Sequence, residues 1–349
     1  MWAGLRTLKA VVRERSQVLR YYSWAVAEKA LSAIPFGTQL YRGAGVVANR
    51  NGRSRRRLVG TATAYELVRM ARKMTPHGGT ILDVGTGWHH HDSVLLFLTG
   101  GNYRIFLFDI EDKARLPYLH TYFEFLLENL DELEREVRID KKSARDKLQY
   151  LMSLKSRNEI YAACNFSLCI TRQVDKPFLP EKSVDFMLSN CVLTHIPPEV
   201  VGPELVALRR MLKPEGTMYM MIGHDDHWSF HDASMNQFNY YRYSDKFYKT
   251  LFDTKFEYQN RMVKSEWLPI FGRAGLNIAH YHPVITEQTL QDIQALPHID
   301  ERFAKYPLEE LATLHSYFLL APAEASGDGG AYSETGSQAG RHRVPVQPN

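Results

Sequence analysis

Short apolar segments rich in β-branched and aromatic residues alternate along this chain with longer segments whose apolar residues recur at helical spacing. The short segments have the length of buried strands, and glycine-containing or polar turns separate them from the helical ones. Helices are expected, for example, over Val94–Leu98 and Val200–Leu212. This alternation predicts an α/β fold with a mostly parallel sheet, whose ligands bind at the carboxyl ends of the strands. The first five expected strands are Thr80–Val84, Arg104–Asp109, Phe166–Ile170, Val184–Asn190 and Thr217–Ile222.

The first two strands carry the most informative pattern. The first ends in the turn Gly85-Thr86-Gly87, a helical segment follows, and the second ends in Asp109. Glycine lets the backbone approach a ligand closely, and the amino terminus of the next helix offers unpaired N–H groups. A carboxylate at the end of the second strand can accept hydrogen bonds from both hydroxyls of a ribose. The pattern therefore predicts a site for a nucleoside-containing cofactor.

Two classes of cofactor use this layout. Dinucleotides need a third glycine, and His90 stands at that position, which disfavours NAD and FAD. S-adenosylmethionine has no phosphates and needs only the turn, an acid before it and an acid for the ribose. Asp83 and Asp109 stand where those acids are expected.

Composition narrows the class of protein only slightly. The chain has 349 residues, 44% of them hydrophobic, and a formal net charge of +4, which is too small to indicate nucleic acid as a partner. Three unevenly spaced cysteines favour a reducing compartment. No apolar run has the length of a membrane span, and no signal peptide is evident, so a cytoplasmic location is expected. The oligomeric state cannot be predicted from these features.

Three segments lie outside the α/β pattern. Residues 1–60 form a basic helical extension, stopped by Pro35-Phe36-Gly37, and residues 323–349 have the composition of a disordered tail. The extension is expected either to pack on the main domain (61–322) or to contact the anionic inner face of a membrane. The charged stretch at about 113–160 is much longer than a simple crossover between two parallel strands needs, and it predicts an inserted helical hairpin.

The ordered motifs resemble those of class I S-adenosylmethionine-dependent methyltransferases. The resemblance is carried by Ile81–Gly87, Phe108-Asp109, Ser183–Phe186 with Val192–Ile196, and Leu212–Gly216, the last expected as a helix stop and turn. It implies a Rossmann-like sheet of seven strands, in which Ile278–Val284 and Ser316–Ala321 are the closing antiparallel strands. The combination of Gly85–His89 with Asp226–Asp232, after the fifth strand, is similar to a bacterial subgroup often associated with polysaccharide biosynthesis. The cofactor-binding residues implied by the resemblance are Asp83, Gly85, Thr86, Gly87, Asp109 and Asn190.

The sequence departs from the family pattern at three places. His89 replaces the last glycine of the loop, and Thr194 stands where a glutamate usually precedes the histidine. Arg172 and Gln173 occupy the place of the acid that usually contacts adenine, so no adenine contact is predicted.

Methyl transfer needs in-line positioning and, for a hydroxyl acceptor, removal of a proton. The expected catalytic residues are His227 as the base, with Asp226 beside it, and His195. The expected acceptor is an oxygen of a glycan or another small molecule.

Two other functions stay open. The segments His89–Asp92 and His224–His227 together suit a metal-dependent enzyme, although their spacing is unfavourable and no metal ligand is predicted. The altered glycine loop also allows a non-catalytic scaffold that docks through the basic amino-terminal helix.

Overall fold

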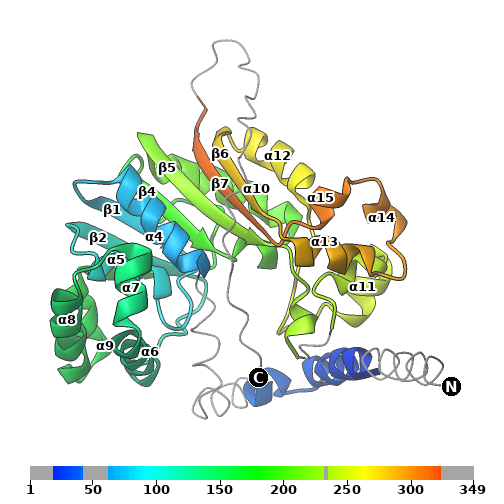
Figure 1. Ribbon diagram of the computed structural model, residues 1–349, viewed down its shortest axis with the longest axis horizontal. Helices are drawn as coiled ribbons and strands as arrows, with labels where there is room; N and C mark the ends of the chain where they lie inside the picture. Colours follow the sequence, from blue (N-terminus) through cyan, green and yellow to red (C-terminus); the bar gives the residue numbers. More distant parts are fainter. Residues whose placement is uncertain (1–18, 42–61, 232–234, 324–349) are drawn as a thin grey trace.

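The structure is a computed structural model that describes residues 19–41, 62–231 and 235–323. A seven-stranded sheet in the order β3-β2-β1-β4-β5-β7-β6 forms its centre (Figure 1). Neighbouring strands are parallel except where β7 pairs with β5 and β6 in antiparallel orientation. The predicted mostly parallel Rossmann-like sheet with an antiparallel closing strand is confirmed. The strands are β1 (Gly79–Val84), β2 (Tyr103–Asp109), β3 (Phe166–Ile170), β4 (Val184–Asn190), β5 (Leu212–Gly223), β6 (Leu276–Val284) and β7 (His315–Pro322).

Helices cover both faces of the sheet, because successive residues of its strands point to opposite sides. Ile81 and Ile105 face a core formed with α4 (Ala62–Met74) and α5 (His91–Leu98). Leu82 faces a second core, formed with α10 (Pro198–Met211) and α12 (Lys264–Arg273). These strands are apolar on both faces, which is why continuous apolar runs identified them in the sequence.

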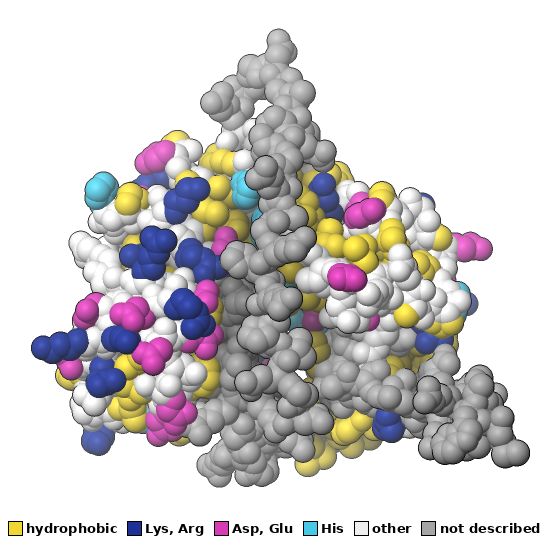
Figure 2. All heavy atoms as spheres, in the orientation of Figure 1, with side chains coloured by type: hydrophobic (Ala, Val, Ile, Leu, Met, Phe, Trp, Pro, Cys, Tyr) yellow, Lys and Arg dark blue, Asp and Glu magenta, His cyan; other side chains and the backbone are white. Residues whose placement is uncertain are grey.

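The segment between β2 and β3 folds into four helices, α6 (Leu116–Glu128), α7 (Leu130–Val137), α8 (Lys141–Ser153) and α9 (Arg157–Cys164). The predicted helical hairpin is therefore too simple. Local signals divide the stretch: Arg138 ends α7 in the left-handed conformation, Asp140 caps α8, and Ser156 caps α9. Acidic and basic side chains are interspersed over this side of the molecule (Figure 2). Such mixing does not favour a polyanionic partner.

The predicted turn at Lys213–Gly216 is also wrong in one respect, because these residues belong to β5. The pairing of β4 with β5 shifts register between Val184 and Phe186, so the extra residues form a bulge within the strand.

A third, aromatic cluster lies beside the sheet. It joins η3 (Asn239–Arg242), α11 (Asp245–Leu251), α13 (Glu287–Gln294), α14 (Glu301–Ala304) and α15 (Leu308–Leu311). Residues 19–33 are helical and bury Tyr21 and Ala25 in this cluster. This part of the amino-terminal extension packs on the main domain, whereas its basic run at Arg53–Arg57 and the tail at 324–349 lie outside the described residues. None of the described helices is long and apolar enough to cross a bilayer.

Candidate functional site

The glycine turn after β1 has a conformation that side chains would disrupt. Gly85 and Gly87 have φ of +76° and +65°, in the left-handed region. A Cβ atom on Gly85 would lie 2.3 Å from Cγ2 of Val192. The amides of Gly85 and Thr86 both donate to the Phe108 carbonyl, at 2.8 and 3.0 Å, so the turn is fastened to the end of β2.

The two predicted acids contact this turn from different sides. Oδ2 of Asp83 accepts hydrogen bonds from Thr86 Oγ1 at 3.0 Å and Ser93 Oγ at 2.6 Å. Oδ2 of Asp109 accepts one from the Gly87 amide at 3.1 Å. Burial raises the pKa of Asp83 to about 6, and the charge of Asp109 contributes to the rise. The acids therefore converge on one turn, as the sequence predicted.

His90, at the position of the third glycine of a dinucleotide loop, takes the left-handed conformation itself, with φ of +53°. Its ring compensates with two hydrogen bonds, Nδ1 to Thr86 Oγ1 and Nε2 to the Tyr161 hydroxyl, both at 2.7 Å. Burial lowers its pKa to about 4. His90 is thus a neutral structural residue that shapes the turn.

A cavity of about 300 Å³ opens beside the turn. The rings of His89 and His91 stack there, with centroids 5.0 Å apart. Burial lowers the pKa of His89 to about 4 and that of His91 to about 3. Their Nε2 atoms are buried and have no hydrogen-bond partner among the described residues. The cavity is lined by Thr63, Gly85, Thr86, Gly87, Trp88, His89, His91, Asp92 and Asn190.

Asn190 lines this cavity from the end of β4, and its amide donates to the Asp92 carboxyl at 3.2 and 3.3 Å. Burial raises the pKa of Asp92 to about 8, and the charge of Asp83 adds to the effect. Asp92 also lines the cavity, although it is not among the residues predicted to bind the cofactor. Its signal in the sequence is an acid in the first turn of the helix that follows the glycine turn.

A second group of polar residues lies at the ends of β4 and β5. His195 belongs to η1 (Leu193–His195) and His227 to η2 (His227–His231), and their ring centroids are 4.8 Å apart. Glu257 Oε1 lies 2.9 Å from His227 Nδ1 and 3.6 Å from His195 Nδ1. Burial alone would lower the pKa of His227, but its interactions with Cys191 and Glu257 raise it well above the ordinary value. Two of the three predicted catalytic residues are therefore neighbours.

Asp226 does not take the place expected for it. Its fully buried carboxyl accepts hydrogen bonds from the Tyr21 hydroxyl at 2.6 Å and the Trp228 amide at 3.0 Å. Glu257 holds the His227 ring instead, because adjacent residues project in different directions and only a separate segment reaches the imidazole. Sequence reasoning missed Glu257, which is 30 positions away.

The two histidine segments considered for a metal do not share a cavity. Both ring nitrogens of His224 are occupied, by the Met262 carbonyl at 3.0 Å and Ser316 Oγ at 2.9 Å. His89, His91 and Asp92 line the cavity beside the glycine turn, and no residue of His224–His227 does. The combination of His89–Asp92 with His224–His227 is therefore excluded as a single ligand set.

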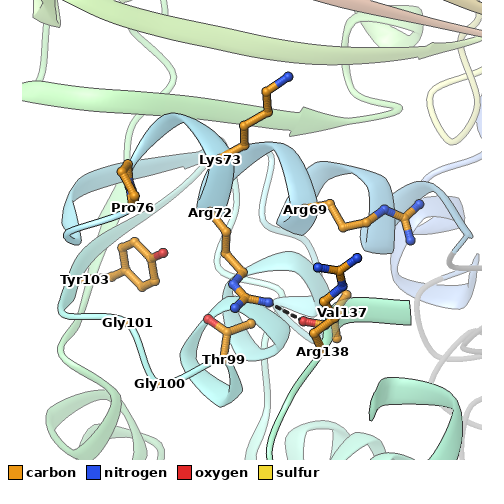
Figure 3. Close-up of a pocket in the computed structure, with 10 residues that line it drawn as sticks. All are labelled: Arg69, Arg72, Lys73, Pro76, Thr99, Gly100, Gly101, Tyr103, Val137 and Arg138. Atoms are coloured by element: carbon orange, nitrogen blue, oxygen red, sulfur yellow. Dashed lines mark hydrogen bonds between the residues drawn. The ribbon is translucent and has the colours of Figure 1, made fainter. Parts of the chain in front are cut away.

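A larger cavity, of about 540 Å³, lies at the amino ends of β1 and β2, away from the glycine turn (Figure 3). Four basic side chains line it, those of Arg69, Arg72, Lys73 and Arg138. Arg69 pairs with Glu66 and Glu136, and Arg72 donates to the Val137 carbonyl at 2.5 Å. Because basic groups commonly stabilise carboxyl ends of helices, this cavity needs no ligand to explain its charge.

No family model and no curated protein matches the sequence. Several solved structures to which the chain is similar are S-adenosylmethionine-dependent methyltransferases. One is the 1,6-didemethyltoxoflavin-N1-methyltransferase of Burkholderia thailandensis, solved with S-adenosylhomocysteine. It is 12% identical, with 82% of this chain and 89% of that chain covered and a TM-score of 0.43. A second is a TehB-like enzyme of Corynebacterium glutamicum, 12% identical, with 80% and 99% covered and a TM-score of 0.40.

A third is phosphoethanolamine N-methyltransferase 2 of Haemonchus contortus, solved with S-adenosyl-L-methionine. It is 13% identical, with 74% of this chain and 52% of that chain covered and a TM-score of 0.39. Similarities this distant do not establish a function, which has to be argued from the chain's own site.

Proposed function

We propose that this protein transfers a methyl group from S-adenosylmethionine to an oxygen atom of a small-molecule acceptor. One observation carries the proposal: Asp83 and Asp109 converge on a glycine turn beside a cavity that Asn190 closes from the neighbouring strand. The resemblance to polysaccharide-associated enzymes makes a glycan or lipid-linked sugar our preferred acceptor.

The residues present suit the cofactor. Asp109 has the position for the ribose hydroxyls, because it ends β2 and contacts the turn through Gly87. His89 and His91 line the cavity, and a rotation of either ring would bring its unpartnered Nε2 atom to the polar methionine part. The missing Cβ of Gly87, whose surroundings are open, leaves room for a ligand against the backbone.

When bound, S-adenosylmethionine supplies a methyl group on a sulfonium, with the thioether as leaving group. The chain has to hold the acceptor in line and take up its proton. His195, His227 and Glu257, where β4 and β5 finish, would receive that proton. They do not line the cavity beside the glycine turn, but His227 interacts with Cys191, the residue that follows Asn190. Asp226 would support His227 indirectly. Its carboxylate accepts a hydrogen bond from the Trp228 amide and so fixes the start of η2.

Calorimetry with S-adenosylhomocysteine tests the cofactor part. The wild type should bind one molecule per chain, and Asp109→Ala should weaken binding about 30- to 150-fold, since a buried charged acceptor contributes about 2–3 kcal/mol. Glu181→Gln is the matched control, because Glu181 lies on the surface in an ion pair with Arg210. Absence of binding by the wild type would reject the proposal.

Docking on a membrane surface is a second candidate function, favoured by the apolar side chains that the amino-terminal segment exposes. Val26 is 54% exposed in the helix that buries Tyr21 and Ala25, and Phe36 and Leu40, which follow this helix, are 74% and 58% exposed. Sedimentation with anionic liposomes compares the wild type with Val26→Ser/Phe36→Ser. Equal sedimentation of the two proteins would remove this candidate, and with it a location at a membrane face.

A further inference from the structure

His195, His227 and Glu257 bring three ligand-type atoms together from three separate segments. One ring nitrogen of each histidine and one carboxylate oxygen all lie within 4.8 Å of one another. The segments follow β4, β5 and α11, so the grouping is a product of the fold and not of local sequence.

The separations suit a metal ion. Four-coordinate zinc has ligands at about 2.0–2.1 Å, which places neighbouring ligand atoms about 3.3 Å apart. Glu257 Oε1 lies 2.9 Å from His227 Nδ1 and 3.6 Å from His195 Nδ1, on either side of that value. Small side-chain rotations would therefore admit an ion between the three groups, and binding through His195 Nδ1 would replace its hydrogen bond to the Tyr258 carbonyl at 3.0 Å.

The backbone around these ligands is already fixed. The Asn260 side chain donates to the carbonyls of Leu193 and Ile196, at 2.8 and 3.0 Å, on both sides of His195. The Gln259 side chain joins the same segment to the end of β5, because it donates to the Asp225 carbonyl at 2.5 Å. Glu257 is thus held against both histidines before any ligand binds, which reduces the entropic cost of binding.

One side of the cluster faces solvent. The His195 side chain is 41% exposed, that of Glu257 27% and that of His227 only 9%, so a further ligand could approach the cluster from the His195 side. Three protein ligands with an open position are typical of catalytic metal sites, whereas structural sites are closed. Imidazole and carboxylate together favour zinc, iron(II), cobalt or manganese.

We propose that His195, His227 and Glu257 bind one divalent transition-metal ion at the acceptor end of the site. The ion's role rests on the proposed function: a hydroxyl acceptor that occupies the open position would lose its proton to water more readily, because the ion lowers the hydroxyl's pKa. His227 would then act as a ligand and not as the base. Metal binding itself does not depend on methyl transfer.

The test is calorimetry of chelator-treated full-length protein with Zn²⁺ alone, followed by the visible spectrum of the Co²⁺-loaded protein. The wild type should bind one ion per chain and give the intense absorption bands of four-coordinate cobalt. His195→Gln and Glu257→Gln should each weaken Zn²⁺ binding at least about 100-fold, because each removes one of three ligands. Unchanged thermal unfolding would show that these variants are folded.

Two controls exclude binding elsewhere. His77→Gln alters an exposed histidine before β1, and His280→Gln/His282→Gln removes two histidines two positions apart on β6. Both should bind Zn²⁺ like the wild type. If His195→Gln and Glu257→Gln bind equally well, or if the wild type binds no stoichiometric ion, the metal site is refuted. S-adenosylhomocysteine binding, measured separately on the metal-free protein, reports on the proposed function alone.

Discussion

The two ends of the site hold their polar groups in opposite ways. At the glycine turn, Asp83 and Asp92 are carboxyls with raised pKa values, and His89 and His91 have lowered ones, because burial disfavours the charged form of each group. At the ends of β4 and β5, an imidazole and a carboxylate form an ion pair with an exposed edge. Under the two proposals, the first end would enclose the cofactor, and the second would provide proton or metal chemistry at the acceptor.

The largest effect is expected from Gly85→Ala. Its Cβ would collide with Val192, and its φ of +76° is strained for alanine, so we expect a loss of about 3–4 kcal/mol in unfolding free energy and no cofactor binding. Gly202→Ala is the matched control, since nothing lies within 4 Å of its Cβ in α10, and it should stabilise by about 0.5–1 kcal/mol. Chemical denaturation measures both. If the two variants are equally stable, the glycine turn does not depend on the left-handed conformation of Gly85 or on its close contact with Val192.

A pH effect at Asp92 comes next. Its pKa rises from 3.8 unfolded to about 8 folded, so the folded protein retains a proton that the unfolded chain has lost. This contribution to stability is complete below the lower value and disappears as pH rises through about 8, with a slope of at most about 1.4 kcal/mol per pH unit. The unfolding free energy of Asp92→Asn should fall less over this range. Parallel pH profiles of variant and wild type would contradict the assignment.

The smallest effect concerns the support of the acceptor end. Tyr21→Phe removes the hydrogen bond to the buried Asp226 carboxyl and should cost about 1–3 kcal/mol. Tyr22→Phe, whose hydroxyl donates to Tyr243 at 3.1 Å in a partly buried position, should cost less. Thermal unfolding ranks the two. The reverse order would mean that Asp226 does not depend on the amino-terminal segment.

The two ends of the site also differ in how far they could be predicted from the sequence. The glycine turn, its two acids and the histidines all lie between Asp83 and Asp109, so local order and strand periodicity were sufficient to bring them together. The seven-stranded sheet with its closing antiparallel strands also followed from the resemblance. The acceptor end could not be predicted in this way, because Glu257 reaches His227 only through the long-range bonds of Gln259 and Asn260.

Asp226 shows the complementary error. Next to His227 in sequence, it was expected to orient the imidazole, but burial directs its carboxyl to Tyr21, over 200 positions away. The division of 113–160 into four helices depended on caps, and these are single-residue signals that overall charge patterning does not reveal.

The hydrogen bond between the His90 ring and the Tyr161 hydroxyl has a practical consequence for protein engineering. Tyr161 belongs to α9, so the backbone strain at position 90 is offset by a partner from the inserted helices. A shortened protein that lacks α6–α9 would keep the strain without its compensation. Such a minimal version should therefore also carry His90→Gly, which relieves the backbone without the missing tyrosine.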